Sequence, residues 1–122
     1  REQGTSMIFK VGDMSGMRLN EEETVILLSN LLDNAIHECL KVVKAGRKAV
    51  IHIKLVQEGG KIILSVKNPV LEKVQITDGI VLDSNGGMHG IGLSNVKAVV
   101  DKYGGDFVIS CDSEKFQAVV ML

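Results

Sequence analysis

Two asparagines four positions apart are the first residues of this sequence whose types and spacing could do chemistry. Asn30 and Asn34 lie in a segment with helical periodicity, so both amide groups are expected on one face of a helix. Asparagine is unfavourable inside a helix, so the pair costs stability. Its amide oxygens suit a hard cation such as Mg²⁺, although an ordinary solvated helix face explains the same pattern.

A second candidate is a glycine-rich run that leads into a predicted helix, Gly87-Met88-His89-Gly90-Ile91-Gly92-Leu93. Free backbone N–H groups at the start of a helix favour phosphate. The run lacks the Gly-Lys-Ser/Thr ending of a Walker motif, and no clear strand leads into it as a Rossmann turn requires. Taken alone, it is also consistent with a plain loop.

The third candidate is Asn68, which follows an alternating strand and precedes Pro69. Ile62, Leu64 and Val66 point to one face of that strand, and Asn68 continues the same parity. An amide carried to the apolar face needs a hydrogen-bond partner. It either caps its own turn or bonds the edge of a nucleotide base.

These groups depend on a simple order of elements. The sequence predicts a strand at 6–11, a helix from an Asn20 cap to about Ala45, a hairpin of strands 48–56 and 61–67, a lid-like loop at 70–89, a helix from Gly90 to Tyr103, and strands 106–111 and 116–121. Strands and helices do not alternate strictly. The expected fold class is therefore α+β, with a mixed sheet of about five strands and helices on one face.

The long helix is expected to have two distinct sides. One side should face the core and carries Val25, Leu28, Leu31, Leu32, Ala35, Ile36, Cys39, Val42 and Val43. The opposite side should carry Asn30, Asn34, His37 and Lys41.

Composition narrows the function further. The chain has 122 residues, a formal net charge of −1, one Tyr, three Phe and no Trp, so we expect one domain that does not bind nucleic acid. Cys39 and Cys111 occupy apolar positions without a metal-ligand spacing, so we expect reduced core thiols. No apolar stretch is long enough for a membrane span, and no signal peptide opens the chain.

Together the three segments resemble a known family, the GHKL ATPases, and within it the catalytic domain of sensor histidine kinases. Asn30-Leu31-Leu32-Asp33-Asn34-Ala35 resembles the N box, and His89-Gly90-Ile91-Gly92-Leu93-Ser94-Asn95-Val96 resembles the last glycine box. Lys102-Tyr103-Gly104-Gly105 completes a likeness that covers roughly residues 6–122. The likeness is to the quorum-sensing and citrate-sensor-like branch, and it implies a two-layer α/β sandwich of the Bergerat type.

The resemblance also implies ligands and roles. ATP and Mg²⁺ are the implied cofactors, with Asn34 as the Mg²⁺ ligand, Asn30 assisting it and Asn68 accepting a hydrogen bond from adenine. Gly90 and Gly92 would supply phosphate-facing backbone, and His37, Lys41 and His89 are weaker candidates for phosphate contact. The implied ATP-binding set is Asn30, Asn34, His37, Lys41, Asn68, His89, Gly90, Ile91, Gly92 and Leu93.

Two departures from the family pattern affect the mechanism. Asn68-Pro69 stands where the family usually has Asp followed by Gly, and an amide can donate as well as accept. Asn30 stands where hydrolytic relatives and anti-sigma-factor serine kinases carry a general-base Glu, which an amide cannot replace. We therefore expect phosphate transfer to a histidine. The alternatives are a degenerate GHKL interaction module without phosphotransfer and an anti-sigma-factor serine kinase, which Asn30 disfavours.

The resemblance places the remaining machinery outside this sequence. His37, His52 and His89 all belong to other elements, so no phosphoacceptor histidine and no certain catalytic residue is assigned here. We expect residues 1–122 to be a single domain cut from a longer chain. Its implied partners are an upstream dimerisation and phosphoacceptor domain and a response regulator. The implied location is cytoplasmic, within a homodimeric parent protein associated with the bacterial cell membrane.

Overall fold

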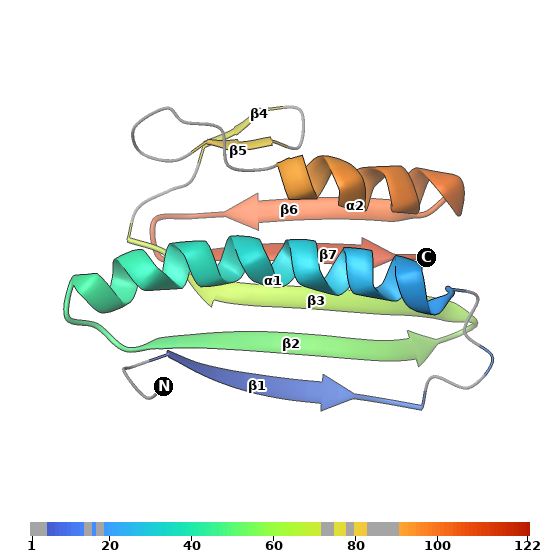
Figure 1. Ribbon diagram of the computed structural model, residues 1–122. Helices are drawn as coiled ribbons and strands as arrows, with labels where there is room; N and C mark the ends of the chain where they lie inside the picture. Colours follow the sequence, from blue (N-terminus) through green and yellow to red (C-terminus); the bar gives the residue numbers. More distant parts are fainter. Residues whose placement is uncertain (1–4, 14–15, 17–18, 72–74, 78–79, 83–90) are drawn as a thin grey trace.

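The computed structural model describes residues 5–13, 16, 19–71, 75–77, 80–82 and 91–122. Nine elements follow one another in chain order (Figure 1): β1 (Thr5–Val11), α1 (Glu21–Lys44), β2 (Ala49–Glu58), β3 (Lys61–Pro69), β4 (Gln75–Thr77), β5 (Ile80–Leu82), α2 (Ile91–Lys102), β6 (Asp106–Cys111) and β7 (Lys115–Met121). Apart from β4 and β5, each element matches a segment that the sequence predicts.

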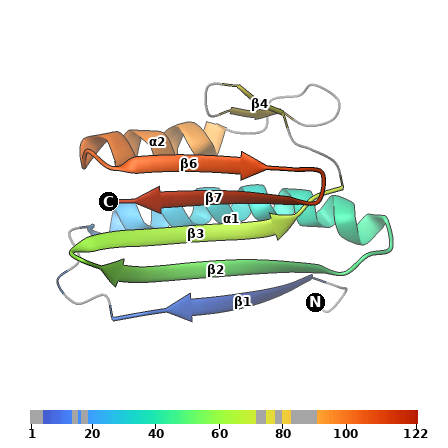
Figure 2. The ribbon, with the colours of Figure 1, turned by 180° about the vertical axis from the view of Figure 1, so that it is seen from behind.

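Five strands form one sheet in the order β1-β2-β3-β7-β6. β1 runs parallel to β2, because α1 connects these two strands as a crossover, and the other neighbours are antiparallel. Both helices cover the same face of the sheet, and Figure 2 shows the opposite face without helices. The predicted α+β class, with a mixed sheet of five strands and helices on one face, is confirmed.

The start and the end of α1 follow from local chemistry. Asn20 caps the helix with its side-chain oxygen, and Glu23 completes a capping box by accepting from the Asn20 backbone N–H. The first-turn carboxylates lie where the helix dipole favours negative charge. The chain leaves the helix through Gly46 at φ 84°, a conformation that favours glycine.

One prediction about α1 is wrong in its details. Val25 was expected in the core but is 61% exposed, whereas Leu27 is 1% exposed and Asn34, expected on the opposite side, is 5% exposed. The reason is that α1 is covered on two sides, by the sheet and by α2. Its buried surface is therefore rotated toward α2 and includes polar positions that a single apolar stripe excludes.

The hairpin of β2 and β3 agrees with the alternation in the sequence. Gly59 and Gly60 turn the chain with positive φ values of 58° and 79°. Every second residue of β3 is buried, and Asn68, at 1% exposure, lies in the core with its apolar neighbours. The largest fully buried side chains of the core include Phe116, which pairs with Asn68 across β3 and β7, and also Leu27, Leu31 and Ile51.

A small hairpin lies within the segment 70–89, which was expected to be a loop. β4 and β5 pair antiparallel in a separate two-stranded sheet. The sequence between them contains Asp78-Gly79, a dipeptide that is common in tight hairpin turns. The strands have three residues each, too few for alternation to be recognised.

The end of α2 explains the pair of glycines after Tyr103. Gly104 has φ 66°, and a Cβ at Gly105 would overlap the carbonyl oxygen of Met121. The chain therefore passes closely beside β7 before it enters β6.

Both cysteines are free. Cys39 is 1% exposed, and burial together with the charge of Glu38 raises its pKa to about 11. Cys111 is half-buried and its Sγ donates to the Asp112 carbonyl oxygen over 3.3 Å. Of the helices among the described residues, neither has the length and apolarity that crossing a membrane requires.

Candidate functional site

Two buried amide side chains project into the core with an unpaired oxygen each. Asn34 of α1 is 5% exposed and Asn68 of β3 is 1% exposed. The Oδ1 atoms of both residues are buried and have no hydrogen-bond partner among the described residues. A buried acceptor without a donor costs about 1–3 kcal/mol. Such a cost at two positions marks the place where a ligand could supply the missing donor or cation.

Asn68 is held in one orientation. Its Nδ2 donates to the Pro69 carbonyl oxygen over 3.0 Å, which leaves Oδ1 as the group that faces the interior. The end of β3 is fixed by pairing with β7, where Asn68 lies opposite the buried Phe116. The sequence left open whether this side chain caps its turn or binds a ligand. In the structure, the Asn68 Nδ2 atom hydrogen-bonds the turn, and the Oδ1 atom has no partner among the described residues.

The two asparagines of α1 are not equivalent. Asn30 is half-buried and its Nδ2 donates to the Ile26 carbonyl oxygen over 2.7 Å, one turn earlier in the helix. Asn34 lies deeper and keeps an unpaired Oδ1. The two amides that were expected to act as a pair therefore differ. Asn34 has a buried acceptor oxygen without a partner among the described residues, and Asn30 lies closer to the surface with its nitrogen already hydrogen-bonded.

A carboxylate and a cation continue the same side of α1. Lys41 is half-buried, and its Nζ lies 3.2 Å from Oε2 of Glu38, whose side chain is almost completely buried. His37 is also half-buried on this helix. The charge of Lys41 is thus shared with Glu38, and any phosphate contact by Lys41 would compete with that ion pair.

The glycine-rich run is described only in part. His89 and Gly90 lie outside the described residues, and Ile91 and Gly92 form the first backbone positions of α2. Leu93 is 1% exposed and packs in the core with Val96 and Val100. The glycine box therefore stays a prediction, apart from the helix that it was expected to begin.

The residues fit one cation ligand of the expected kind. Among the described ranges there is no group of three or more His, Cys, Asp or Glu side chains that would hold a metal ion. The unpaired Oδ1 of Asn34 is a neutral oxygen of the type that Mg²⁺ accepts beside phosphate oxygens. Asn34 thus fits as a single protein ligand to a Mg²⁺ ion carried in with a nucleotide.

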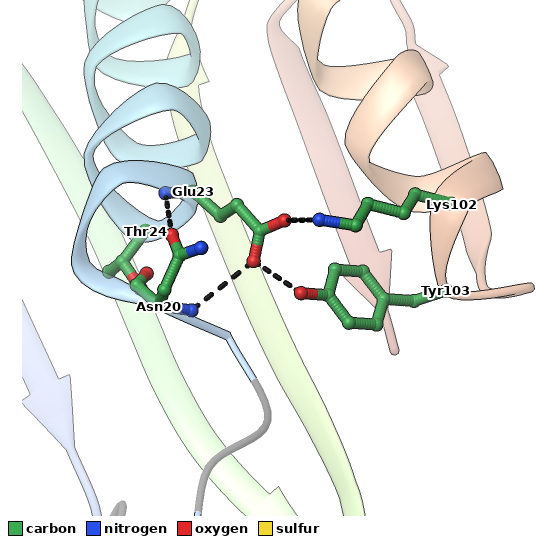
Figure 3. A network of polar contacts seen from close by, with 5 residues as sticks. All are labelled: Asn20, Glu23, Thr24, Lys102 and Tyr103. Carbon is green, nitrogen blue, oxygen red and sulfur yellow. Dashed lines mark hydrogen bonds and ion pairs between the residues drawn. The ribbon is translucent and has the colours of Figure 1, made fainter.

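A second polar cluster, centred on the buried Glu23, was missed by sequence reasoning (Figure 3). Glu23 is 6% exposed, and its carboxylate accepts from Lys102 Nζ, from the Tyr103 hydroxyl and from the Asn20 backbone N–H. The hydrogen bonds from Lys102 and then Tyr103 lower the pKa of Glu23 to about 2. The sequence assigned Glu23 only to the helix cap, because its other partners lie about 80 positions away. This cluster joins the start of α1 to the end of α2.

The two buried polar regions lie at opposite ends of the helix pair. Figure 1 shows the start of α1 and the end of α2 together at one end, while the carboxyl end of β3, which carries Asn68, lies beneath the second half of α1. Figure 2 shows the same arrangement from behind. The end with unsatisfied oxygens is also the end at which α2 begins, after the glycine-rich run.

Comparison with known proteins identifies the family and the fold. A family model described as a GHKL domain matches residues 19–122. No curated protein sequence matches the chain at a significant level. The histidine kinase domain of the blue-light activated histidine kinase from Erythrobacter litoralis superposes with a TM-score of 0.67 at 14% identity, covering 98% of this chain and 54% of that one. This chain thus spans about half the length of that structure.

Two further solved structures share the fold. The catalytic domain of the histidine kinase ThkA, in a nucleotide-free form, has a TM-score of 0.72 at 16% identity and covers 98% of this chain and 79% of its own. Full-length ShkA, in complex with AMPPNP, has a TM-score of 0.64 at 17% identity and covers 98% of this chain and 26% of its own. Because the family model covers most of the sequence, this chain belongs to the GHKL domain family, and its fold is that of histidine kinase catalytic domains.

Proposed function

We propose that this domain binds Mg-ATP and donates the γ-phosphate to a histidine on a separate upstream dimerisation domain, as part of a two-component signalling protein. The observation that carries the proposal is the pair of buried amide oxygens of Asn34 and Asn68, which have no hydrogen-bond partner in the described part of this GHKL fold. Each oxygen lacks a partner that ATP or its metal ion would bring. Binding would remove two unfavourable interactions that the empty domain tolerates.

Asn68 is the proposed adenine acceptor. Its Nδ2 is bonded to the Pro69 carbonyl oxygen, so the side chain offers Oδ1, an acceptor, to the base. The exocyclic amine of adenine would donate to it. Guanine carries a carbonyl oxygen at the corresponding position and would place two acceptors against each other. With its nitrogen already bonded, Asn68 would accept the hydrogen bond from adenine, as the Asp that is usual in this family does.

The phosphate end is proposed at α1 and the start of α2. Asn34 Oδ1 would bind Mg²⁺, with Asn30 assisting, while His37, Lys41 and His89 would contact phosphate. Gly90, Ile91, Gly92 and Leu93 would offer the beginning of α2 to the phosphates, with the lid at 70–89 over them. When bound, Mg²⁺ neutralises charge on the β- and γ-phosphates. The AMPPNP found in ShkA supports an ATP-like ligand for this fold.

The absence of a base favours a histidine acceptor. Asn30 is an amide at the position where hydrolytic relatives have Glu, and it has no proton acceptor of comparable basicity. A neutral imidazole already holds the lone pair that attacks the γ-phosphorus, so it needs less assistance. ADP leaves as the phosphorus–nitrogen bond forms. The acceptor histidine would lie on an upstream dimerisation domain of the same longer protein, a membrane-associated homodimer in which this domain is cytoplasmic. The response regulator would be a separate partner.

Calorimetric titration with AMPPNP tests the binding step. The domain should bind AMPPNP more tightly with Mg²⁺ than with excess EDTA, and it should bind GTP analogues more weakly than AMPPNP. No heat and no thermal stabilisation with AMPPNP under either condition would overturn the proposal and leave a GHKL interaction module without nucleotide.

The transfer step requires the acceptor segment. When an upstream phosphoacceptor segment is supplied in trans or tethered to Arg1, incubation with γ-labelled ATP should yield an acid-labile, alkali-stable phosphohistidine. Free phosphate release should stay near background. Brisk phosphate release by the isolated domain would instead place it among the hydrolytic members of the family.

A further inference from the structure

Glu38 is a buried carboxylate of α1 that has no part in the helix cap or in the proposed contacts with the nucleotide. It is 4% exposed. Leu31 and Val42, seven positions before it and four after it, are each 2% exposed and belong to the hydrophobic core. At about 100° per residue, the three side chains share one stripe of the helix. Glu38 therefore occupies a position that normally carries an apolar residue, and a carboxylate buried there is unfavourable unless it is paired.

The pairing of Glu38 is incomplete when it is compared with that of Glu23. Both oxygens of Glu23 accept hydrogen bonds in the cluster that Figure 3 shows. Glu38 accepts one hydrogen bond, from Lys41 Nζ to Oε2 over 3.2 Å, and no described residue donates to its Oε1 atom. The two carboxylates are about equally buried, at 6% and 4% exposure. Of the two, only Glu38 has an oxygen available for a further donor.

Glu38 lies at the end of the molecule that carries the two unpaired amide oxygens. It follows Asn34 by four positions, so the two side chains are one helical turn apart, with their Cβ atoms separated by about 5–6 Å. The carboxyl end of β3, which carries Asn68, lies beneath the second half of α1 (Figure 1). Asn34 Oδ1, Glu38 Oε1 and Asn68 Oδ1 are therefore three acceptors at one end, and none receives a hydrogen bond from a described residue.

Three acceptors of this kind favour a ligand that brings donors or a cation. In Mg-ATP these are the Mg²⁺ ion, the exocyclic amine of adenine and the two hydroxyl groups of ribose. The phosphate oxygens are negatively charged acceptors, so a carboxylate would repel them. The ammonium group of Lys41 already lies 3.2 Å from Glu38 and disfavours a second cation there. With Mg²⁺ at Asn34 and the amine at Asn68, the ribose hydroxyl groups remain for Glu38.

We propose that Glu38 binds the ribose of the nucleotide, with its Oε1 atom accepting a hydrogen bond from the sugar hydroxyl groups. This inference rests on the proposed function, because it takes an adenine nucleotide with Mg²⁺ as the ligand of the site. Lys41 holds the other carboxylate oxygen, which leaves Oε1 for the sugar. A hydrogen bond to a charged acceptor is stronger than one between neutral groups. The site therefore distinguishes ribonucleotides from nucleotides whose sugar lacks these hydroxyl groups.

Calorimetric titration with ADP and with 2′,3′-dideoxy-ADP, each in excess Mg²⁺, tests this contact. Wild type should bind ADP at least about tenfold more tightly than the dideoxy nucleotide, because the latter lacks the donor for a charged acceptor. Glu38→Leu removes the acceptor at a similar volume and should bring the two affinities to within about twofold of each other. Glu38→Gln keeps an uncharged acceptor and should give an intermediate ratio.

Glu23→Gln is the matched control, since it makes the same substitution at the other buried carboxylate of α1. It should retain the wild-type ratio of the two affinities, because Glu23 lies at the opposite end of the helix pair. Circular dichroism should show the wild-type fold for the Glu38 variants. The side chain of Lys41 is 32% exposed, so its ammonium group can turn to solvent when the carboxylate is removed.

Equal affinities of the wild-type domain for ADP and 2′,3′-dideoxy-ADP would overturn the assignment of Glu38 to the ribose, and this result needs no variant. A ratio that Glu38→Leu leaves at the wild-type value would do the same. Loss of the Mg²⁺ enhancement in Glu38→Leu without a change in the ratio would place the carboxylate on the metal ion instead. All three results leave the proposed nucleotide site intact, whereas a wild-type domain that binds neither ADP nor AMPPNP would refute the proposed function itself.

Discussion

Glu23 and Asn34 lie on the same side of α1, about three helical turns apart, and both side chains are almost completely buried. Glu23 accepts hydrogen bonds from Lys102, Tyr103 and Asn20. Within the described part of the chain, the Asn34 Oδ1 atom has no donor, and the same holds for Asn68 Oδ1 on the facing strand. One helix thus carries a satisfied buried polar group at its start and an unsatisfied one at its middle.

The difference separates a structural contact from the proposed binding site. The Glu23 cluster joins two helices through a charge that is fully partnered, so its contribution is present in the empty domain. The oxygens of Asn34 and Asn68 are unfavourable in the empty domain, and in the proposed function a donor or cation would remove that cost. Substitutions at the two ends should therefore affect different measurements, namely stability at Glu23 and ligand binding at Asn34 and Asn68.

The largest effect is expected from placing a carboxylate at the binding end. Asn30→Glu should raise the rate of phosphate release from ATP on the order of 10²-fold, because general-base assistance has at least that typical size. Asn30→Gln keeps an amide and should stay at the wild-type rate. A phosphate-release assay compares the three chains. Equal rates at equal AMPPNP affinity would mean that position 30 does not face the attacking water.

The next effect concerns the base. Asn68→Leu should weaken AMPPNP binding by about 1–3 kcal/mol, or about 5–150-fold, since the adenine amine would lose its acceptor in a dry pocket. Asn68→Asp restores an acceptor oxygen and should bind within a few-fold of wild type. Calorimetric titration measures both. The melting temperature of the empty Asn68→Leu domain should change little, because removal of an unpaired buried oxygen offsets the loss of the Nδ2 hydrogen bond to the Pro69 carbonyl oxygen.

A smaller effect is expected at the metal ligand. Asn34→Ala should lose the enhancement by Mg²⁺, which corresponds to roughly a tenfold weaker affinity for Mg-AMPPNP. Affinity in the presence of EDTA should change little. Glu23→Gln is the matched control from the same side of the helix, and it should bind Mg-AMPPNP as the wild type does. A Mg²⁺ enhancement that survives in Asn34→Ala would assign the metal to other ligands.

The fold was largely predictable because its signals are local. Asn20 with Glu23, Gly46, Gly59-Gly60 and the alternation of β3 each identify an element from a few neighbouring residues. Asn68 could be placed on the buried face by parity alone, and the structure confirms that position. Each of these features is decided by residues close together in the chain.

What escaped prediction depends on contacts between distant segments. The sequence treats α1 as a helix with one apolar stripe, but α2 covers a second side and buries Asn34 and Glu23 there. Nothing local indicates that Glu23 meets Tyr103. The hairpin of β4 and β5 is too short to show a period. His89 and Gly90 lie outside the described residues, so their part in the site stays a prediction.

The last prediction concerns the pH dependence of the Glu23 cluster, where the change is in stability and not in binding. Lys102 and then Tyr103 lower the pKa of Glu23 from 4.5 to about 2, so its contribution to stability is present above pH 4.5 and is lost as the pH falls toward 2. The pKa values of Lys102 and Tyr103 are raised above 10.5 and 10.0 by Glu23, so their contribution is present at neutral pH and disappears in strong alkali. Glu23→Gln should therefore melt at a lower temperature than wild type at pH 7, and the difference should shrink between pH 4.5 and 2.

The control is an exposed ion pair, Lys97 with Asp101. Their charged atoms are 3.4 Å apart and their side chains are 60% and 66% exposed, so Asp101→Asn should lower the free energy of unfolding by at most about 0.5 kcal/mol. Thermal melts at pH 7, 4 and 3 measure both variants, and a difference between wild type and Glu23→Gln that stays constant down to pH 3 would contradict the assignment of a depressed pKa to Glu23.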